Sequence, residues 1–129
     1  MFKPPSVSNL VVGNERCPLL IGTSGYSYTE WSDSGFYPAD TRTGDMLGLY
    51  MQFFPVVELN YTWYQMPRAE AVARMIAKAP ADFLFAAKLV RTLTHERSGE
   101  WQKHLGQYLK GIAPLKERLA AILVQLPPD

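Results

Sequence analysis

The sequence predicts an α/β protein with a parallel sheet, because short apolar segments alternate along it with amphipathic segments of helical period. The apolar segments are 19–21, 56–60, 83–88 and 121–125, and the amphipathic ones are 44–54, 67–79 and 99–111, with a further helical piece at 114–119. Such alternation is typical of parallel strands joined by right-handed crossovers. Four strands form either a small open sheet or half of an eight-stranded barrel, and periodicity leaves both open.

Each expected helix has an apolar stripe and local boundary signals. The stripes are Met46, Leu49, Tyr50 and Phe53 in the first helix, Val72, Met75, Ile76 and Ala79 in the second, and Trp101, Leu105, Tyr108, Leu109 and Ile112 in the third. Pro55 closes the first helix, and Pro67 suits the first turn of the second, which Pro80 stops. We expect a loop rich in aromatic residues over 26–43.

Polar residues stand at the carboxyl ends of the last three apolar segments. They are Glu58 and Asn60, then Lys88, then Gln125. Because side chains alternate between the faces of a strand, Glu58 and Asn60 share one face, and Lys88 and Gln125 lie on the matching faces of their own strands. Ligand sites in parallel α/β proteins lie beyond the carboxyl ends of the strands. The sequence therefore predicts where a site lies, without naming its reaction.

Four motifs resemble the YecE-like family, also called domain of unknown function 72. They comprise residues 21–28 with Trp31 and 36–38, residues 57–60 with Thr62, Tyr64 and Pro67, residues 83–88 with 93–95, and residues 123–128. Tyr26 replaces a tryptophan usual in the family, and Trp63 replaces a phenylalanine. The resemblance implies a TIM-type (β/α)₈ barrel, of which this chain supplies about half, with four strands. It carries no established reaction.

Length and composition restrict the class of protein. The chain of 129 residues is 47% hydrophobic, enough for one domain, and we assign 19–129 to the N-terminal half of the barrel and 1–18 to an N-terminal extension. On this interpretation the chain is truncated. The formal net charge of +1 indicates neither nucleic acid nor membrane as partner. With one cysteine, Cys17, and no apolar run near 18 residues, we expect a cytoplasmic protein.

The catalytic candidates are Glu58, Lys88 and His95. On neighbouring strands, Glu58 and Lys88 would come close enough to tune each other's pKa for acid/base chemistry; the alternative is a structural salt bridge in the barrel mouth. His95 follows the third strand and is a candidate general base or metal ligand, or else a loop histidine bonded to Glu96. A metal site usually needs three protein ligands, so we expect none here, and the sequence identifies no cofactor.

The candidate binding residues are Asn60, Gln125, Tyr26, Trp31 and Tyr64. Aromatic residues gather in the loops after the first two strands, which suits a stacking platform for a sugar or a nucleobase. The alternative is a secondary core over the barrel mouth, which we favour for Trp31, Phe36 and Tyr37. Gly22 and Gly25 do not form a dinucleotide-binding motif, and we expect Gly22 to allow a close backbone approach.

These observations predict a cavity for a small polar or anionic ligand and acid/base chemistry of a hydrolase, lyase or isomerase. The alternative is a non-catalytic module that binds a ligand or a protein through the aromatic loop. Half a barrel also leaves two strand edges and an apolar inner face open, so we expect self-association or pairing with a complementary half-barrel.

Overall fold

A computed structural model of the chain describes residues 8–12, 14–97 and 99–128. Its main sheet has four parallel strands in sequential order: β3 (Gly22–Ser24), β4 (Val56–Leu59), β5 (Leu84–Lys88) and β6 (Leu119–Leu123). The predicted parallel sheet is therefore confirmed.

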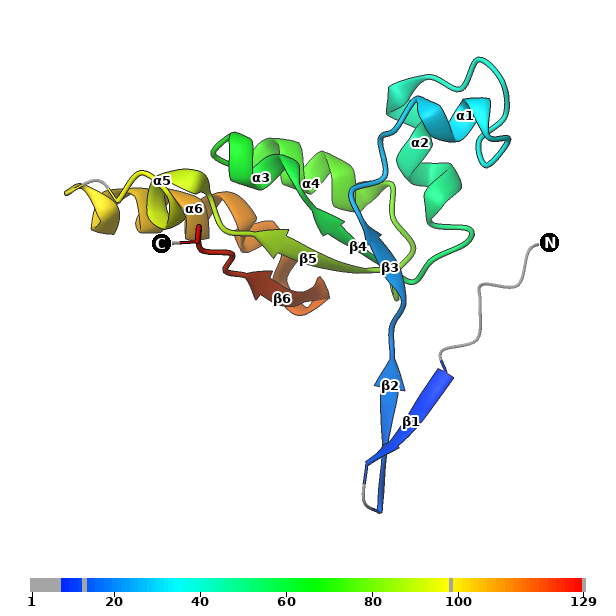
Figure 1. Cartoon of the computed structure of the whole chain (residues 1–129), viewed down its shortest axis with the longest axis horizontal. Helices are drawn as coiled ribbons and strands as arrows, with labels where there is room; N and C mark the ends of the chain where they lie inside the picture. Colours follow the sequence, from blue (N-terminus) through cyan, green and yellow to red (C-terminus); the bar gives the residue numbers. More distant parts are fainter. Residues whose placement is uncertain (1–7, 13, 98, 129) are drawn as a thin grey trace.

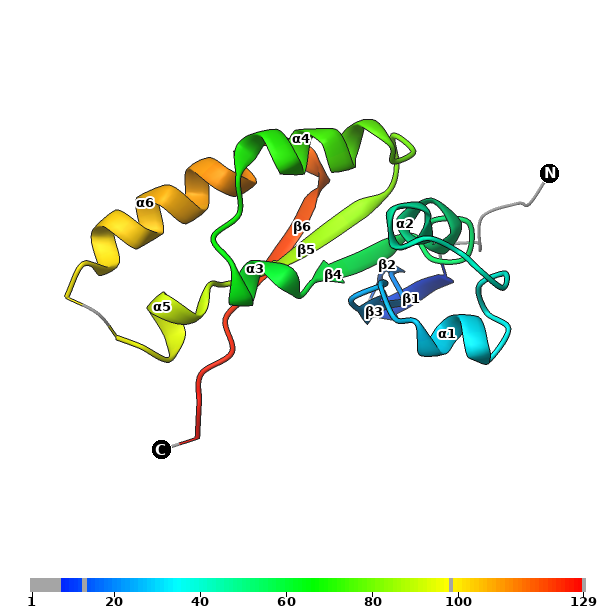
Figure 2. The same ribbon diagram turned by 90° about the horizontal axis from the view of Figure 1, so that it is seen from above.

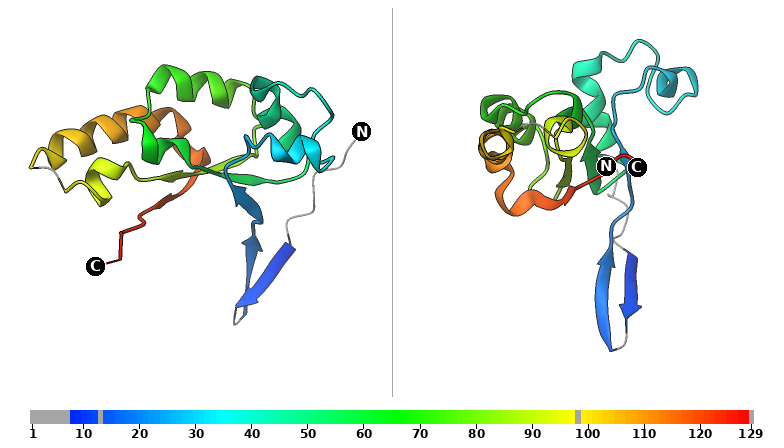
Figure 3. Two further views of the ribbon diagram at one scale, coloured as in Figure 1. Left: turned by 45° about the horizontal axis from the view of Figure 1, so that its top comes forward. Right: turned by 60° about the vertical axis from the view of Figure 1, so that its left-hand side comes forward.

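Helices connect these strands and cover one face of the sheet. They are α1 (Glu30–Asp33), α2 (Thr43–Tyr50), α3 (Tyr61–Tyr64), α4 (Ala69–Ala77), α5 (Arg91–Thr94), α6 (Trp101–Ile112) and the 3₁₀ helix η1 (Ala113–Arg118). Figure 2 shows α4 and α6 on one side of β4, β5 and β6, and the left view of Figure 3 shows α2 on that side as well. In the described part of the chain no helix covers the other face.

The core lies between the sheet and these helices. Val57 and Leu59 of β4 and Phe85 and Ala87 of β5 are buried, whereas the residues between them are only half-buried. The helices contribute Met46, Leu47, Tyr50, Val72, Tyr108 and Ile112, and Leu115 comes from η1. The predicted alternation is confirmed for β4 and β5: one face of each packs on helices, and the other carries Glu58 and Lys88.

Consecutive parallel strands in sequential order, with helices on one face, are the (β/α) units of a TIM-type barrel, here about half a barrel. The inner face of this half-barrel is the face that no described helix covers. No helix within the described residues is long and apolar enough to cross a bilayer.

Tyr50 and Gly22 join the short strand β3 to β4. The buried Tyr50 hydroxyl accepts a hydrogen bond from the Thr23 amide (2.8 Å) and donates one to the Val56 carbonyl (2.9 Å). A Cβ at Gly22 would lie 2.1 Å from the same carbonyl oxygen, so only glycine fits there. The expected close approach at Gly22 is confirmed.

The N-terminal part of the chain forms a hairpin that the sequence analysis did not predict. Strands β1 (Ser8–Val12) and β2 (Glu15–Leu19) pair antiparallel and project away from the main sheet (Figure 1). They occupy half of the expected extension 1–18; residues 1–7 and 13 lie outside the described residues.

Several boundaries differ from those predicted. The first strand of the parallel sheet is Gly22–Ser24, not 19–21, and Leu19 ends the hairpin instead. The last strand is Leu119–Leu123, so it begins and ends two residues before the predicted 121–125. Its first residue, Leu119, lies opposite Phe85, and a register irregularity follows between Phe85 and Ala86. The predicted loops contain the short helices α1, α3 and α5.

The buried side of α6 also differs from the predicted stripe. Tyr108, Gly111 and Ile112 are buried, but Trp101 and Leu109 are 51% and 46% exposed. Gly111 makes this packing close, because a Cβ there would lie 2.1 Å from the Pro67 carbonyl oxygen. The backbone before α4 therefore touches α6 where the helix has no side chain.

Two buried tyrosines make stability fall at high pH. Burial raises the pKa of both Tyr37 and Tyr108 to about 12, with the nearby Tyr50 and Tyr26 raising that of Tyr37 further. Between pH 10 and 12 the unfolded chain loses these protons while the folded chain keeps them, so the free energy of unfolding falls. At pH 11 we expect a loss of roughly 1.4 kcal/mol for each tyrosine.

Urea unfolding at pH 9 and pH 11 measures this loss. Between these two pH values the Tyr108→Phe variant should lose roughly 1.4 kcal/mol less stability than the wild type. Tyr64→Phe, at a tyrosine that is 70% exposed, should leave it unchanged. Equal stability of the wild type at the two pH values would contradict the prediction.

Candidate functional site

A chain of hydrogen bonds joins three side chains at the carboxyl ends of β3 and β4. Asn60 Nδ2 donates to Ser24 Oγ (2.8 Å), which donates to Glu58 Oε1 (2.9 Å). The pairing of the two strands produces this contact, because Ser24 lies opposite Glu58 in the parallel register. The Glu58 carboxylate is thus held in one position by an oriented hydroxyl.

These residues border a cavity of about 340 Å³. Its described lining consists of Gly25, Tyr26, Ser27, Tyr28, Glu58, Leu59, Asn60, Tyr61 and Tyr64. The Gly25 amide donates to the Glu58 carbonyl (2.9 Å) and Tyr28 OH to the Ser24 carbonyl (2.5 Å), which fixes the loop after β3 against β4. Gly25 suits this turn, with a φ of +80°. The cavity lies at the end of the strands where the sequence predicts a site.

Two of the tyrosines in this cavity, Tyr26 and Tyr61, remain protonated at neutral pH. Burial raises the pKa of Tyr26 and Tyr61, and the proximity of Tyr26 raises that of Tyr61 further. Their hydroxyls are therefore neutral groups that can donate or accept hydrogen bonds. The single charged side chain among the described lining residues is Glu58.

Lys88 lies on the same face of the sheet as Glu58 but has different side-chain neighbours. Glu58 lies opposite Ala86, two residues before Lys88, so both side chains come from the rim of neighbouring strands. Lys88 Nζ lies 5.5 Å from the centre of the Trp63 ring, a cation–π distance. Among the described residues no ion pair joins Glu58 to Lys88, so the alternative of a structural salt bridge between them is not formed.

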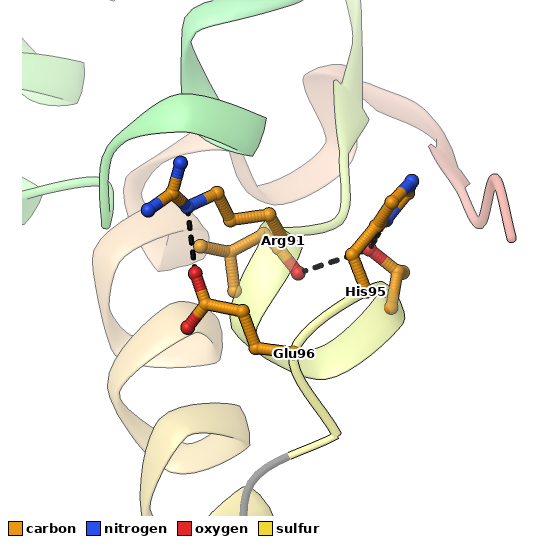
Figure 4. A network of polar contacts seen from close by, with 5 residues as sticks. Arg91, His95 and Glu96 are labelled. Carbon is orange, nitrogen blue, oxygen red and sulfur yellow. Dashed lines mark hydrogen bonds and ion pairs between the residues drawn. The ribbon is translucent and has the colours of Figure 1, made fainter. Parts of the chain in front are cut away.

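His95 also lies beside the Trp63 ring. The two ring centroids are 5.1 Å apart in an edge-to-face arrangement, and His95 Nδ1 is 2.8 Å from Thr94 Oγ1. Glu96 instead pairs with Arg91 (2.8 Å), and the His95 ring points away from that pair (Figure 4). The alternative of a histidine bonded to Glu96 is therefore wrong, and Lys88, Trp63 and His95 form a second group on the rim.

The other predicted binding residues divide between the cavity and the core. Tyr26, Asn60 and Tyr64 line the cavity. Trp31 contacts Phe36 and Tyr37 with ring centroids 5.2 and 5.8 Å apart. Tyr37 belongs to the main core and the other two pack against it, so these three form no separate core over the barrel mouth. Gln125 is exposed beyond the end of β6 and is not among the described cavity residues.

Over the described ranges, no three His, Cys, Asp or Glu side chains come together in a group that could hold a metal ion. The cavity itself contributes one carboxylate, from Glu58. Its chemistry is that of a carboxylate among tyrosines and an amide.

Sequence reasoning missed Ser24, Tyr28 and Tyr61. Ser24 was placed in a loop because the first strand was predicted three residues early. Had Gly22–Ser24 been aligned with Val56–Glu58 as neighbouring parallel strands, alternation would have put Ser24 beside Glu58. Tyr28 and Tyr61 belong to the aromatic loops that the sequence offers as a stacking platform, but neither is among the named binding residues.

The fold, together with the cavity at the carboxyl ends of the strands, defines the class of protein. The chain is a set of (β/α) units from a TIM-type barrel with polar groups at the carboxyl ends of its strands. The chain belongs to the DUF72 family: the family model described as "Protein of unknown function DUF72" matches residues 20–129. It is 27% identical over 108 residues to the UPF0759 protein YunF of Bacillus subtilis (78% of this chain), and 27% identical over 110 residues to YecE of Escherichia coli K12 (84% of this chain). The chain spans 38% of the length of each relative.

Solved structures of a DUF72 family protein from Enterococcus faecalis V583 agree with this fold. The structure at 3.10 Å resolution has a TM-score of 0.65 and 27% identity, over 84% of this chain and 39% of that one. The structure at 2.52 Å resolution has a TM-score of 0.55 and 30% identity, over 67% of this chain and 37% of the other. These relatives are uncharacterised proteins by name, so they establish a family and a fold.

Proposed function

We propose that the chain provides a binding site for a small polar or anionic ligand at the carboxyl ends of its strands. Glu58 would act there in acid/base chemistry of a hydrolase, lyase or isomerase. The observation that carries the proposal is the chain of hydrogen bonds from Asn60 through Ser24 to Glu58 beside a cavity of about 340 Å³.

The geometry supports this role because it holds a carboxylate without neutralising it. Ser24 occupies Oε1, whereas the structure gives Oε2 no partner among the described residues. A group that transfers protons must be positioned and must keep a free atom for the substrate. A carboxylate needed only for stability would instead be expected to pair with a cation such as Lys88.

Lys88 supports the second part of the proposal, a polar or anionic group on the ligand. Its ammonium lies over the Trp63 ring and forms no ion pair within the described chain. Because it comes from the strand next to that of Glu58, one ligand can reach both. Asn60 borders the cavity, where its amide group would orient such a ligand.

Thermal-shift screening of metabolites against the chain tests binding. A ligand at about 100 times its Kd stabilises the folded state by about 2.7 kcal/mol. We expect Glu58→Gln and Lys88→Met each to reduce the shift produced by an active metabolite. Glu70→Gln, at an exposed carboxylate of α4, is the matched control and should respond like the wild type.

Recovery of the ligand separates catalysis from binding. In a full-length DUF72 relative, substitutions aligned with Glu58→Gln and Lys88→Met should abolish turnover of the identified metabolite while the protein stays folded. Full activity in both variants would overturn the assignment. A ligand recovered unchanged would show a binding site without catalysis.

A further inference from the structure

The cavity between β3, β4 and α3 has an excess of hydrogen-bond acceptors. The Glu58 carboxylate borders it with a full negative charge, and Oε2 has no partner among the described residues. Asn60 Oδ1 is buried and also has no hydrogen-bond donor among the described residues. The atom of this amide that bonds to Ser24 is Nδ2. Ser24 donates to Glu58, so its oxygen must accept from Nδ2, and this fixes the orientation of the amide.

No positive charge balances this carboxylate locally. Lys, Arg and His are absent from the described lining, and the nearest candidate by register, Lys88, is directed to Trp63. A partly buried carboxylate without a counter-ion attracts a cation and disfavours an anion. The charged group that this end of the site would recognise is therefore positive.

The remaining walls suit the same kind of group. Tyr26, Tyr28, Tyr61 and Tyr64 all line the cavity, and aromatic rings attract ammonium cations through their quadrupole. An ammonium also brings several N–H donors, one of which can bond to Glu58 Oε2. Its carbon skeleton would pack on the tyrosine rings.

We infer that this cavity binds the ammonium group of an organic amine, held by Glu58 between tyrosine rings. The inference rests on the proposed function and narrows its ligand to one that carries an amine at the Glu58 end. A polar or anionic group elsewhere on the same ligand would remain free to reach Lys88.

Isothermal titration of the whole chain with three probes of one shape tests the charge preference. Benzylammonium, benzyl alcohol and benzoate share a ring and differ in their polar group, and glucose serves as a polyhydroxylated probe. We expect benzylammonium to bind more tightly than the alcohol, and benzoate not to bind at this cavity. Glu58→Gln should weaken benzylammonium about tenfold or more, as expected for loss of a charged hydrogen bond, whereas Glu70→Gln should not change it.

Each outcome decides the inference. It is supported if benzylammonium binds and the loss is confined to Glu58→Gln. It is overturned if benzylammonium binds equally well to the wild type and to Glu58→Gln, or if no probe binds. It is also overturned if benzylammonium does not bind while glucose, benzyl alcohol or benzoate binds in a Glu58-dependent way. A metabolite without an amine that binds through Glu58 and Lys88 in the thermal-shift screen would overturn this inference and leave the proposed function intact.

Discussion

The 129-residue chain, expressed alone, is expected to associate in solution at micromolar concentration. The inner face of the sheet carries no described helix, and the edges of β3 and β6 each lack a second neighbouring strand among the described residues. Ile122 and Leu123 of the edge strand β6 are each 38% exposed. Burial of each large apolar side chain contributes about 1.5–3 kcal/mol, so we propose that a second copy or a complementary half-barrel covers this face.

Light scattering across a range of concentrations measures the association. Leu123→Lys places a charge on the open edge strand β6 and should reduce association. Leu109→Lys changes an exposed leucine of α6, away from that edge, and should leave it unchanged. A dispersed, cooperatively unfolding monomer would contradict the proposal.

Gly111→Ala is expected to destabilise the chain by about 2 kcal/mol or more, although alanine is the better helix former. The new methyl group would lie 2.1 Å from the Pro67 carbonyl oxygen, a backbone atom that cannot rotate away. Helix α6 or the segment before α4 must therefore shift, and the packing between these helices loosens. Urea unfolding at pH 7 measures the loss.

Gly106→Ala is the matched control in the same helix. A Cβ at Gly106 meets no atom within 4 Å, so only the helix propensity changes, and we expect a gain of about 0.5–1 kcal/mol. The two substitutions are chemically identical and should differ in sign. If both stabilise the chain, the close approach of Pro67 to α6 is wrong.

The sequence predicts the order of strands and helices well because the burial pattern is local. Val57 and Leu59 alternate with Val56 and Glu58 as one buried and one open face require. The first strand was misplaced because the run 19–21 is more apolar than 22–24. Contact between Gly22 and the Val56 backbone, together with the Tyr50 hydroxyl, decides the pairing, and both are long-range contacts that periodicity does not reveal.

The sequence contains a signal for the N-terminal hairpin. Its strands, Ser8–Val12 and Glu15–Leu19, are separated by a Gly-Asn pair at 13–14, and such a pair between short strands is typical of a two-residue hairpin turn. Pro18 within the second strand is compatible with this hairpin, because proline is tolerated at the edge of a sheet.

The candidate site was predicted in its position and only partly in its contacts. Alternation placed Glu58, Asn60 and Lys88 on the rim, as the structure has them. The prediction that Glu58 and Lys88 interact assumed that oppositely charged side chains at the ends of neighbouring strands contact each other. Ser24 takes one oxygen of Glu58, and the Trp63 ring lies near Lys88, so side-chain packing decides between these partners.

A crystal structure of a full-length DUF72 relative, purified without chelators or competing ligands, tests the central claim most directly. That claim is that the carboxyl ends of β3, β4 and β5 form a ligand site. We predict density for a bound molecule within hydrogen-bond distance of the residue aligned with Glu58 and extending toward the one aligned with Lys88. A ligand bound only elsewhere on the barrel, with the aligned carboxylate and amine joined in a salt bridge, would contradict the account.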